Sequence, residues 1–244
     1  MLMTTLLLLA LIIVAAHLVE TVTGFGATVI ALALAIHLVP LHSLVVTLVI
    51  LGWVQSAYLI ARGWRHIDAG LLLKRVLPLC GLGLAAGAYL FNTLDAPLLK
   101  RVLGVFVIAV AAVELWRLLR RGQEPARLNP LLGAGLLAGG GVIHGMFASG
   151  GPLIVYHASR EIPDKQAFRV TLSALWITLN TALLISYAAS GRIDVASASL
   201  AAKLLLALAV GVVLGELVHR RVDERRFRLV VQGVLLFTGA VLLV

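Results

Sequence analysis

The chain has 244 residues, of which 61% are hydrophobic and only 13% are charged, and its mean hydropathy is +1.06. Soluble domains carry about 25% charged residues, so this composition excludes a water-surrounded globular fold and predicts an all-α polytopic membrane protein. The net charge of +9 would suggest nucleic acid as the partner of a soluble chain. Here Lys and Arg gather in short loops between apolar segments, so we expect a lipid bilayer as the partner and no nucleic acid.

Ten apolar segments follow one another, five in each half. They cover residues 2–22, 27–39, 43–61, 69–90 and 98–119 in the first half, and 131–147, 152–159, 167–189, 195–218 and 227–244 in the second. We expect a first membrane repeat over 1–122, a cytoplasmic linker over 123–130 and a second repeat over 131–244. No A-x-A cleavage site follows the first segment, so we expect it to remain in the mature protein. The single Cys80 excludes a disulfide within the chain and any cysteine-based metal spacing, and we expect no metal and no cofactor.

The two halves resemble each other at a nearly constant offset of 123 to 128 positions. Leu and Ala would match by chance in such a chain, so only Gly, Pro, Trp and Asp are compared. The pairs are Gly26 and Gly150, Pro40 and Pro163, Trp53 and Trp176, Gly83 and Gly211, Gly87 and Gly215, and Asp95 and Asp223. We therefore expect an internal repeat.

Each half begins with an apolar run that glycines interrupt. The interruptions are Thr23-Gly-Phe-Gly-Ala-Thr28 and Gly145-Met-Phe-Ala-Ser-Gly-Gly-Pro152. The segment 27–39 would reach only ~20 Å as a helix, and fusing it to 2–22 would give roughly 57 Å, whereas the apolar core of a bilayer is about 30 Å thick. A helix that enters, a break, and a short helix that returns is the arrangement that fits.

Loop charges give the orientation that we expect. With returning helix pairs, the clusters around Arg62, Arg117 to Arg127, Arg160 to Arg169 and Arg220 to Arg228 all lie on the cytoplasmic side. The loop after the third segment then faces opposite sides in the two halves. We therefore expect two inverted repeats, each with a broken or returning helix pair and three further transmembrane helices, about eight to ten membrane segments in all. Both termini are then external.

Broken helices in matching positions of two halves are typical of a transporter's binding site. A helix that starts at mid-membrane directs its free N–H groups toward an anion, and glycine lets the ligand approach the backbone. The candidate binding residues at the breaks are Gly24, Phe25, Gly26, Thr28, Gly145, Ser149, Gly150, Gly151 and Pro152. The alternative is that these glycines only let helices pack closely, and we prefer that interpretation for Gly83, Gly87, Gly211 and Gly215.

Ionisable and polar residues inside the apolar segments are the other candidates. Glu20 and His144 each lie six residues before the aligned glycine and are candidates for proton coupling, with His17 as a partner of Glu20. The alternative is that one or both lie near the surface and are solvated. Gln55, Thr171 and Asn180 could donate to an oxyanion or bond across helices. Trp53 and Trp176 are equally suited to the core, an interface or a binding wall.

These motifs resemble the sulfite exporter TauE/SafE family of membrane permeases. The resemblance rests on the Gly24-Phe-Gly26 break, on Ser149-Gly-Gly-Pro-Leu153 and on Gly191-Arg-Ile-Asp194 before the ninth segment. It covers nearly the whole chain and implies a permease for sulfite or an organosulfonate in a bacterial inner membrane. In the first half the glycine-rich run followed by Pro-Leu is reduced to Gly-Phe-Gly-Ala-Thr.

From the residues alone we expect a secondary transporter for a small anion; only the resemblance adds sulfur. A passive anion channel is the nearest alternative, and a purely structural membrane protein is another. A membrane-embedded enzyme is disfavoured because no nucleophile–base pair, metal-ligand cluster or nucleotide loop is found in the sequence. Protons are candidate coupling ions, and a homodimer is left open.

Overall fold

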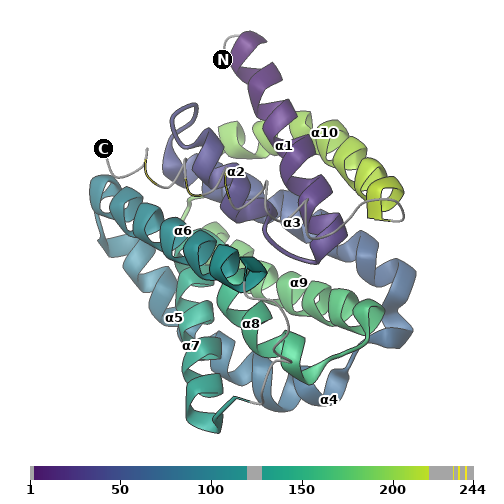
Figure 1. Ribbon diagram of the computed structural model, residues 1–244. Helices are drawn as coiled ribbons and strands as arrows, with labels where there is room; N and C mark the ends of the chain where they lie inside the picture. The colour runs from purple at the N-terminus through teal and green to yellow at the C-terminus, as the bar shows by residue number, and fades with distance from the viewer. Residues whose placement is uncertain (1–2, 120–127, 220–232, 234–235, 237–239, 241–244) are drawn as a thin grey trace.

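The computed structural model describes residues 3–119 and 128–219, together with positions 233, 236 and 240, and all its regular elements are helical (Figure 1). The long helices are α1 (Met3–Thr23), α3 (Leu41–Gly63), α5 (Leu77–Thr93), α6 (Ala96–Leu119), α7 (Pro130–Phe147), α9 (Lys165–Ala189) and α10 (Val195–His219). Seven helical spans in this part of the chain are long and apolar enough to cross a membrane, which confirms the all-α polytopic prediction. Most of the linker 123–130 lies outside the described residues. So does the predicted segment 227–244, except for positions 233, 236 and 240.

Shorter pieces complete two of the long helices. The 3-10 turn η1 (Trp64–His66) extends α3. The short α4 (Ala69–Leu71) and the π-helical η2 (Leu72–Val76) run directly into α5, so that 69–93 forms one continuous span.

Polar side chains mark where several helices begin. An Asn or Asp side chain accepts a hydrogen bond from a backbone N–H of the first turn, which satisfies a donor that the helix itself cannot pair. These caps are Asp68 for α4, Asp95 for α6, Asn129 for α7, Asp164 for α9 and Asp194 for α10. Asp194, the last residue of the Gly-Arg-Ile-Asp motif, thus caps a helix, and its hydrogen bonds with Ser197 hold its pKa below the usual value.

Two helices are too short to span a bilayer, as the sequence predicts. They are α2 (Ala27–Ala35) and α8 (Gly151–Glu161), with 9 and 11 residues. A helix of this length reaches only about 13–17 Å. Each packs beside the helix that precedes it, α2 beside α1 and α8 beside α7 (Figure 1). The chain therefore folds back at both breaks.

The main helix contacts join the two halves of the chain. Helix α1 packs on α10, α5 on α7, and α3 on α9. In the α5–α7 contact the backbones approach so closely that a Cβ atom on Gly83 would lie 2.8 Å from the backbone nitrogen of Val142, and one on Gly145 would lie 2.7 Å from that of Ala88. Small residues permit this approach. The packing interpretation of Gly83 is confirmed, and Gly145, a predicted binding residue, belongs to the same contact.

Helix α10 approaches α1 in the same way. A Cβ on Gly211 would lie 2.7 Å from the carbonyl oxygen of Val14, and one on Gly215 would lie 2.5 Å from Cβ of Thr21. Arg169 of α9 bridges α1 and α10 at the end of this contact. Its guanidinium donates to the Thr21 carbonyl oxygen at 3.2 Å and pairs with Glu216 of α10 at 2.6 Å.

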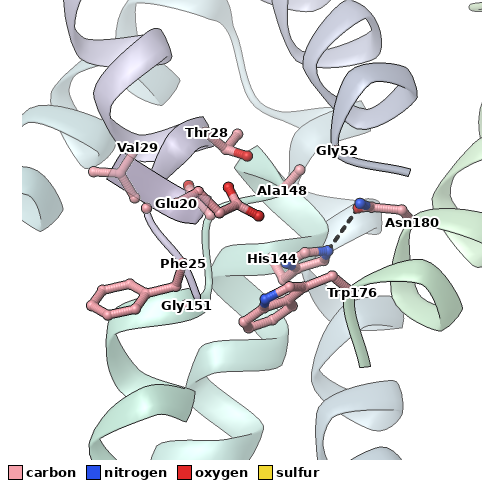
Figure 2. Close-up of a pocket in the computed structure, with 12 residues that line it drawn as sticks. Glu20, Phe25, Thr28, Val29, Gly52, His144, Ala148, Gly151, Trp176 and Asn180 are labelled. Atoms are coloured by element: carbon pink, nitrogen blue, oxygen red, sulfur yellow. Dashed lines mark hydrogen bonds between the residues drawn. The ribbon is translucent and has the colours of Figure 1, made fainter. Parts of the chain in front are cut away.

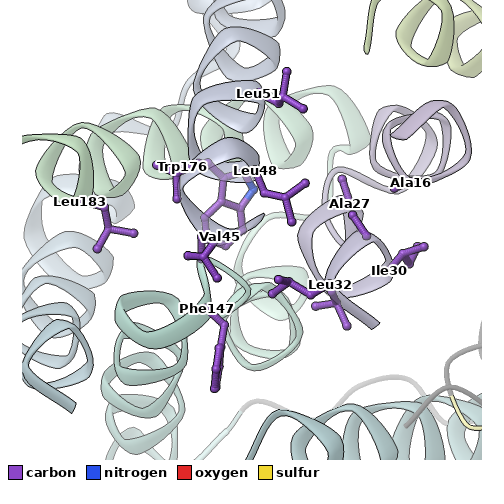
Figure 3. Close-up of a cluster of buried hydrophobic side chains, with 14 of the residues drawn as sticks. Ala16, Ala27, Ile30, Leu32, Val45, Leu48, Leu51, Phe147, Trp176 and Leu183 are labelled. Carbon is purple, nitrogen blue, oxygen red and sulfur yellow. The ribbon is translucent and has the colours of Figure 1, made fainter. Parts of the chain in front are cut away.

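The short helix α2 lies in the centre of the hydrophobic core (Figure 3). Its Leu32 is fully buried, as are Val45 of α3 and Phe147 of α7. Seven of its nine residues are buried. Because α2 is enclosed by longer helices, both chain breaks are held inside the molecule rather than at its surface.

Candidate functional site

A small pocket lies where the two chain breaks face each other (Figure 2). Its volume is about 30 Å³, enough for one or two water molecules. Six helices contribute to its wall, α1, α2, α3, α7, α8 and α9, together with the residues of both breaks. The lining residues are Glu20, Phe25, Gly26, Thr28, Val29, Gly52, His144, Ala148, Ser149, Gly151, Trp176 and Asn180.

The first break turns through two glycines with left-handed backbone conformations. Gly24 has φ +85° and Gly26 has φ +104°, values that side chains with a Cβ atom rarely adopt. The Gly24 N–H donates to the carbonyl oxygen of Glu20 at 2.7 Å and so ends α1. Its own carbonyl oxygen accepts the indole N–H of Trp176 at 3.2 Å. Helix α9 therefore holds the turn that leads into α2.

The second break contains a left-handed residue that is not glycine. Ala148 has φ +51°, and its N–H donates to the His144 carbonyl oxygen at 2.7 Å, which ends α7. A left-handed alanine costs about 1–2 kcal/mol, and such strain is typical of functional sites. Beyond it, a Cβ on Gly150 would overlap the Gly140 carbonyl oxygen, so Gly150 packs α8 onto α7 rather than leaving room for a ligand.

The two breaks meet at Gly151, the first residue of α8. A Cβ atom on Gly151 would lie 3.3 Å from Cβ of Phe25 in the first break. Since both short helices begin here, two helix N-termini are directed at one buried pocket. N–H groups in the first turn of a helix have no partner within the helix and carry about half a positive charge together.

The two N-termini differ in what occupies them. At α2 the Ala27 N–H donates to Oε2 of Glu20 at 3.0 Å. At α8, Pro152 has no N–H, so Gly151 and Leu153 supply the backbone donors of the first turn. The hydroxyl of Ser149 is buried next to them and has no hydrogen-bond partner among the described residues. The α8 end of the pocket thus offers donors to a ligand, and the α2 end already holds a carboxylate.

His144 is held from α9. Its ring stacks on Trp176 with centroids 5.4 Å apart and an angle of 10° between the ring planes. Its Nε2 donates to Oδ1 of Asn180 at 3.1 Å (Figure 2). In the neutral imidazole, Nδ1 is then an acceptor, and it is buried without a partner in the part of the chain that the structure describes. His144 lies in the pocket wall, near the break as the sequence predicts. Its side chain is buried, so it is not a solvated residue at the surface.

A second buried polar network lies in the first half, outside the pocket wall. His17 Nδ1 donates to the Gln55 side-chain oxygen, Gln55 donates to the Thr21 hydroxyl at 3.1 Å, and that hydroxyl donates to the His17 carbonyl oxygen at 2.7 Å. The expectation that His17 pairs with Glu20 is therefore wrong. The network joins α1 to α3, and it gives Gln55 the cohesive role that the sequence left as an alternative.

The structure brings together eight of the fourteen residues proposed from the sequence. Those that line the pocket are Glu20, Phe25, Gly26, Thr28, His144, Ser149, Gly151 and Asn180. Those outside its wall are Gly24, Gln55, Gly145, Gly150, Pro152 and Thr171. Thr171 instead accepts the backbone N–H of Asp68 at 2.9 Å, before α4.

Four lining residues were not proposed from the sequence as binding residues: Val29, Gly52, Ala148 and Trp176. Trp176 had a signal, its pairing with Trp53 in the repeat, but that pattern fits a core or interfacial tryptophan equally well. Gly52 approaches Asn180, because a Cβ there would lie 3.3 Å from the Asn180 amide nitrogen. Val29 and Ala148 carry no such signal. Among the described residues, no group of three His, Cys, Asp or Glu side chains could hold a metal ion.

The sequence was compared with known protein families and with individual proteins. The model of the sulfite exporter TauE/SafE family matches residues 8–242. The chain is also similar to the probable inner membrane transporter protein TsaS of Comamonas testosteroni, with 28% identity over 183 aligned residues. The alignment covers 72% of this chain and 70% of that protein. No solved structure matches it. The match runs along nearly the whole chain, and the described residues contain seven helical spans and two broken helices, so the chain belongs to the sulfite exporter TauE/SafE family and is a multi-pass transporter of the inner membrane.

Proposed function

We propose that the protein is a secondary transporter for a small anion, sulfite or an organosulfonate, and that the anion binds in the pocket between the two breaks. The observation that carries the proposal is the convergence of two helix N-termini, α2 and α8, on one buried pocket. Backbone N–H groups there favour an anion, and the unpartnered Ser149 hydroxyl adds a donor. In the described part of the chain, the wall offers no second acidic side chain beside Glu20.

The size of the pocket bears on the substrate. The pocket is small but partly open, so an inorganic oxyanion fits the position between the breaks and the carbon chain of a sulfonate would extend out of it. Within this proposal both sulfite and an organosulfonate therefore stand. The name of the family adds sulfur chemistry, which the pocket alone would not specify.

Alternating access would follow from an inverted repeat. The contacts between the halves support it, because α1 packs on α10 as α7 packs on α5, while α3 and α9 pack on each other. We propose the repeats as 1–122 and 131–244, with proton coupling through Glu20 and His144. The homodimer stays a prediction that no described contact addresses.

The test is flux into vesicles that contain the purified protein, with sulfite, sulfoacetate, sulfate and a simple carboxylate offered in turn. Gly151→Leu should abolish flux of the transported anion, because its side chain would meet Phe25 and fill the pocket. Gly135→Leu is the matched control, since a Cβ at this exposed position of α7 meets nothing within 4 Å. Normal flux in Gly151→Leu would place the substrate path elsewhere.

A passive anion channel remains the rival that the same vesicles can separate. A transporter coupled to protons moves the anion against its own gradient when a pH gradient is imposed. Flux that dissipates the anion gradient but ignores the pH gradient would favour the channel.

A further inference from the structure

Among the residues that the structure describes, Glu20 is the one carboxylate in the pocket wall. The residue is only 8% exposed, and its side chain points into the pocket toward the second break (Figure 2). An ionised carboxylate in such a place needs a partner, because leaving water is costly for a charge.

The partner is the N-terminus of α2. The backbone N–H of Ala27, the first residue of that helix, donates to Oε2 of Glu20 at 3.0 Å. An oxygen in this position receives a hydrogen bond and the favourable end of the helix dipole, as an oxygen of a bound oxyanion would. The carboxylate of Glu20 thus occupies a position at the α2 N-terminus that would suit a bound anion.

No cation competes for this role among the described residues. Arg169 of α9 lies nearby, but its guanidinium donates to the Thr21 carbonyl oxygen and to Glu216 of α10. His17 of α1 is bound to Gln55, and His144 of α7 is bound to Asn180. Among the described residues, the hydrogen bond from the Ala27 N–H is therefore the partner that the structure gives this carboxylate.

The N-terminus of α8 lines the same pocket. No side chain caps it with a hydrogen bond among the described residues. Gly151, where α8 begins, contacts Phe25 of the first break, and the Ser149 hydroxyl beside it is buried and unpartnered. Glu20 and Gly151 line the same small pocket, so an anion at α8 and an ionised Glu20 would share it and repel each other.

We propose that the N-terminus of α2 is a second anion subsite, which Glu20 occupies as a built-in competitor of the substrate. The transported anion gains the Ala27 N–H only when the carboxylate takes up a proton or swings out of the subsite. This inference rests on the proposed function and deepens it: proton uptake by Glu20 and anion binding then favour each other. The chemistry of the ligand follows, a small anion with at least two oxygens that can bridge the two N-termini.

Binding at equilibrium tests the competition directly. Isothermal titration calorimetry on the full-length protein in detergent would use sulfate and methanesulfonate, whose own charges stay constant between about pH 5 and 8. In wild type the affinity should fall as the pH rises, by up to about tenfold per pH unit where one proton is linked to binding. In Glu20→Gln and Glu20→Ala the affinity should be at least that of wild type at low pH and should no longer change with pH.

Glu161→Gln is the matched control, because it neutralises a carboxylate at the far end of α8 that lies near Arg75 and outside the pocket wall. It should keep the pH dependence of wild type. Binding in Glu20→Ala where wild type binds nothing would also support the competition.

Two results would overturn the inference while leaving the transported anion in place. One is a wild-type pH dependence that persists in Glu20→Gln; the other is weaker binding than wild type at every pH in both Glu20 variants. If neither wild type nor any Glu20 variant binds or transports an anion, the proposed function fails, and the second subsite fails with it.

Discussion

Trp176 connects the two breaks through one side chain. Its ring stacks on His144, which leads to the second break, and its indole N–H donates to the Gly24 carbonyl oxygen in the first. It is only 6% exposed. At the scale of the residue, this side chain keeps the distance between the two helix N-termini that an anion would bridge.

Trp176→Phe should retain part of the stacking and lose the hydrogen bond to Gly24. A buried carbonyl oxygen left without its donor costs about 1–3 kcal/mol of folding stability, and because the first break is then held less firmly, substrate affinity should weaken as well. The measurement is the concentration dependence of flux in vesicles. Trp53→Phe is the control, because the indole of Trp53 donates to Thr181 at a position that is 37% exposed and outside the pocket wall. Equal losses in both variants would contradict the role of Trp176.

Glu20 and His144 should carry the pH dependence of transport. Their aligned positions place both in the pocket wall, where a neutral Glu20 admits an anion and a protonated His144 would attract one. Proton-driven flux measured across a pH series should fail, or lose its pH dependence, in at least one of Glu20→Gln and His144→Gln. Unchanged flux and unchanged pH dependence in both would leave the two residues as structural.

At the scale of the helix, glycine contacts hold the long helices together. Helix α5 meets α7 at Gly83, Gly87, Gly141 and Gly145, and α10 meets α1 at Gly211 and Gly215. Lipid tails are as apolar as leucine, so close van der Waals packing is the main attraction between such helices. Side chains larger than hydrogen would force each pair apart.

Gly83→Leu should therefore destabilise the protein without acting on the pocket. Overpacking typically costs 1–3 kcal/mol, and here the obstacle is backbone of α7, which cannot rotate away. We expect a lower melting temperature in detergent, and size-exclusion chromatography of heated samples would measure it. Gly81→Leu, on the same helix but with nothing within 4 Å of its Cβ, should melt as wild type does. Equal melting of the two variants would contradict the close contact.

At the scale of the whole molecule, each half supplies partners to the other. The first helix of each half packs on the fourth segment of the other half, and the third helices pack on each other. Two-fold related repeats would pack in this way. Gly122 and Arg225, in two of the charged loops, lie outside the described residues, so a test of orientation needs other sites.

His66 and Ser190 supply that test, because they follow α3 and α9, the third helices of the two halves. If the repeats are inverted, the two residues lie on opposite sides of the membrane. In a Cys80→Ala background, His66→Cys should react only with membrane-permeant thiol reagents in intact cells, and Ser190→Cys with impermeant reagents as well. Labelling of both from the same side would contradict the inverted repeat.

Much of the fold could be predicted from the sequence because membranes restrict it so strongly. Lengths of apolar segments gave the bounds of α1, α7 and α10 to within one or two residues, and glycines located both breaks. Contacts across helices were less accessible. His17 was matched to Glu20 by spacing along α1, yet Gln55 of α3 is its partner, since side-chain pairing depends on how helices rotate against each other. The same limit applies to Gly150, where the sequence could not distinguish an approach for a ligand from an approach for α7.

The contact between α1 and α10 has a consequence for how the protein is made. Helix α1 leaves the ribosome first, and its surface around His17 and Thr21 is complementary to Gly211 and Gly215, some two hundred residues later. The polar groups of His17 and Thr21 find their partner Gln55 with α3, but the surface of α1 that meets the two glycines faces lipid or another neighbour until α10 is synthesised, and a contact so distant in sequence forms late. The residues of the site between the breaks are all present once α9 has entered the membrane, so the contact between α1 and α10 closes the molecule after the site is complete.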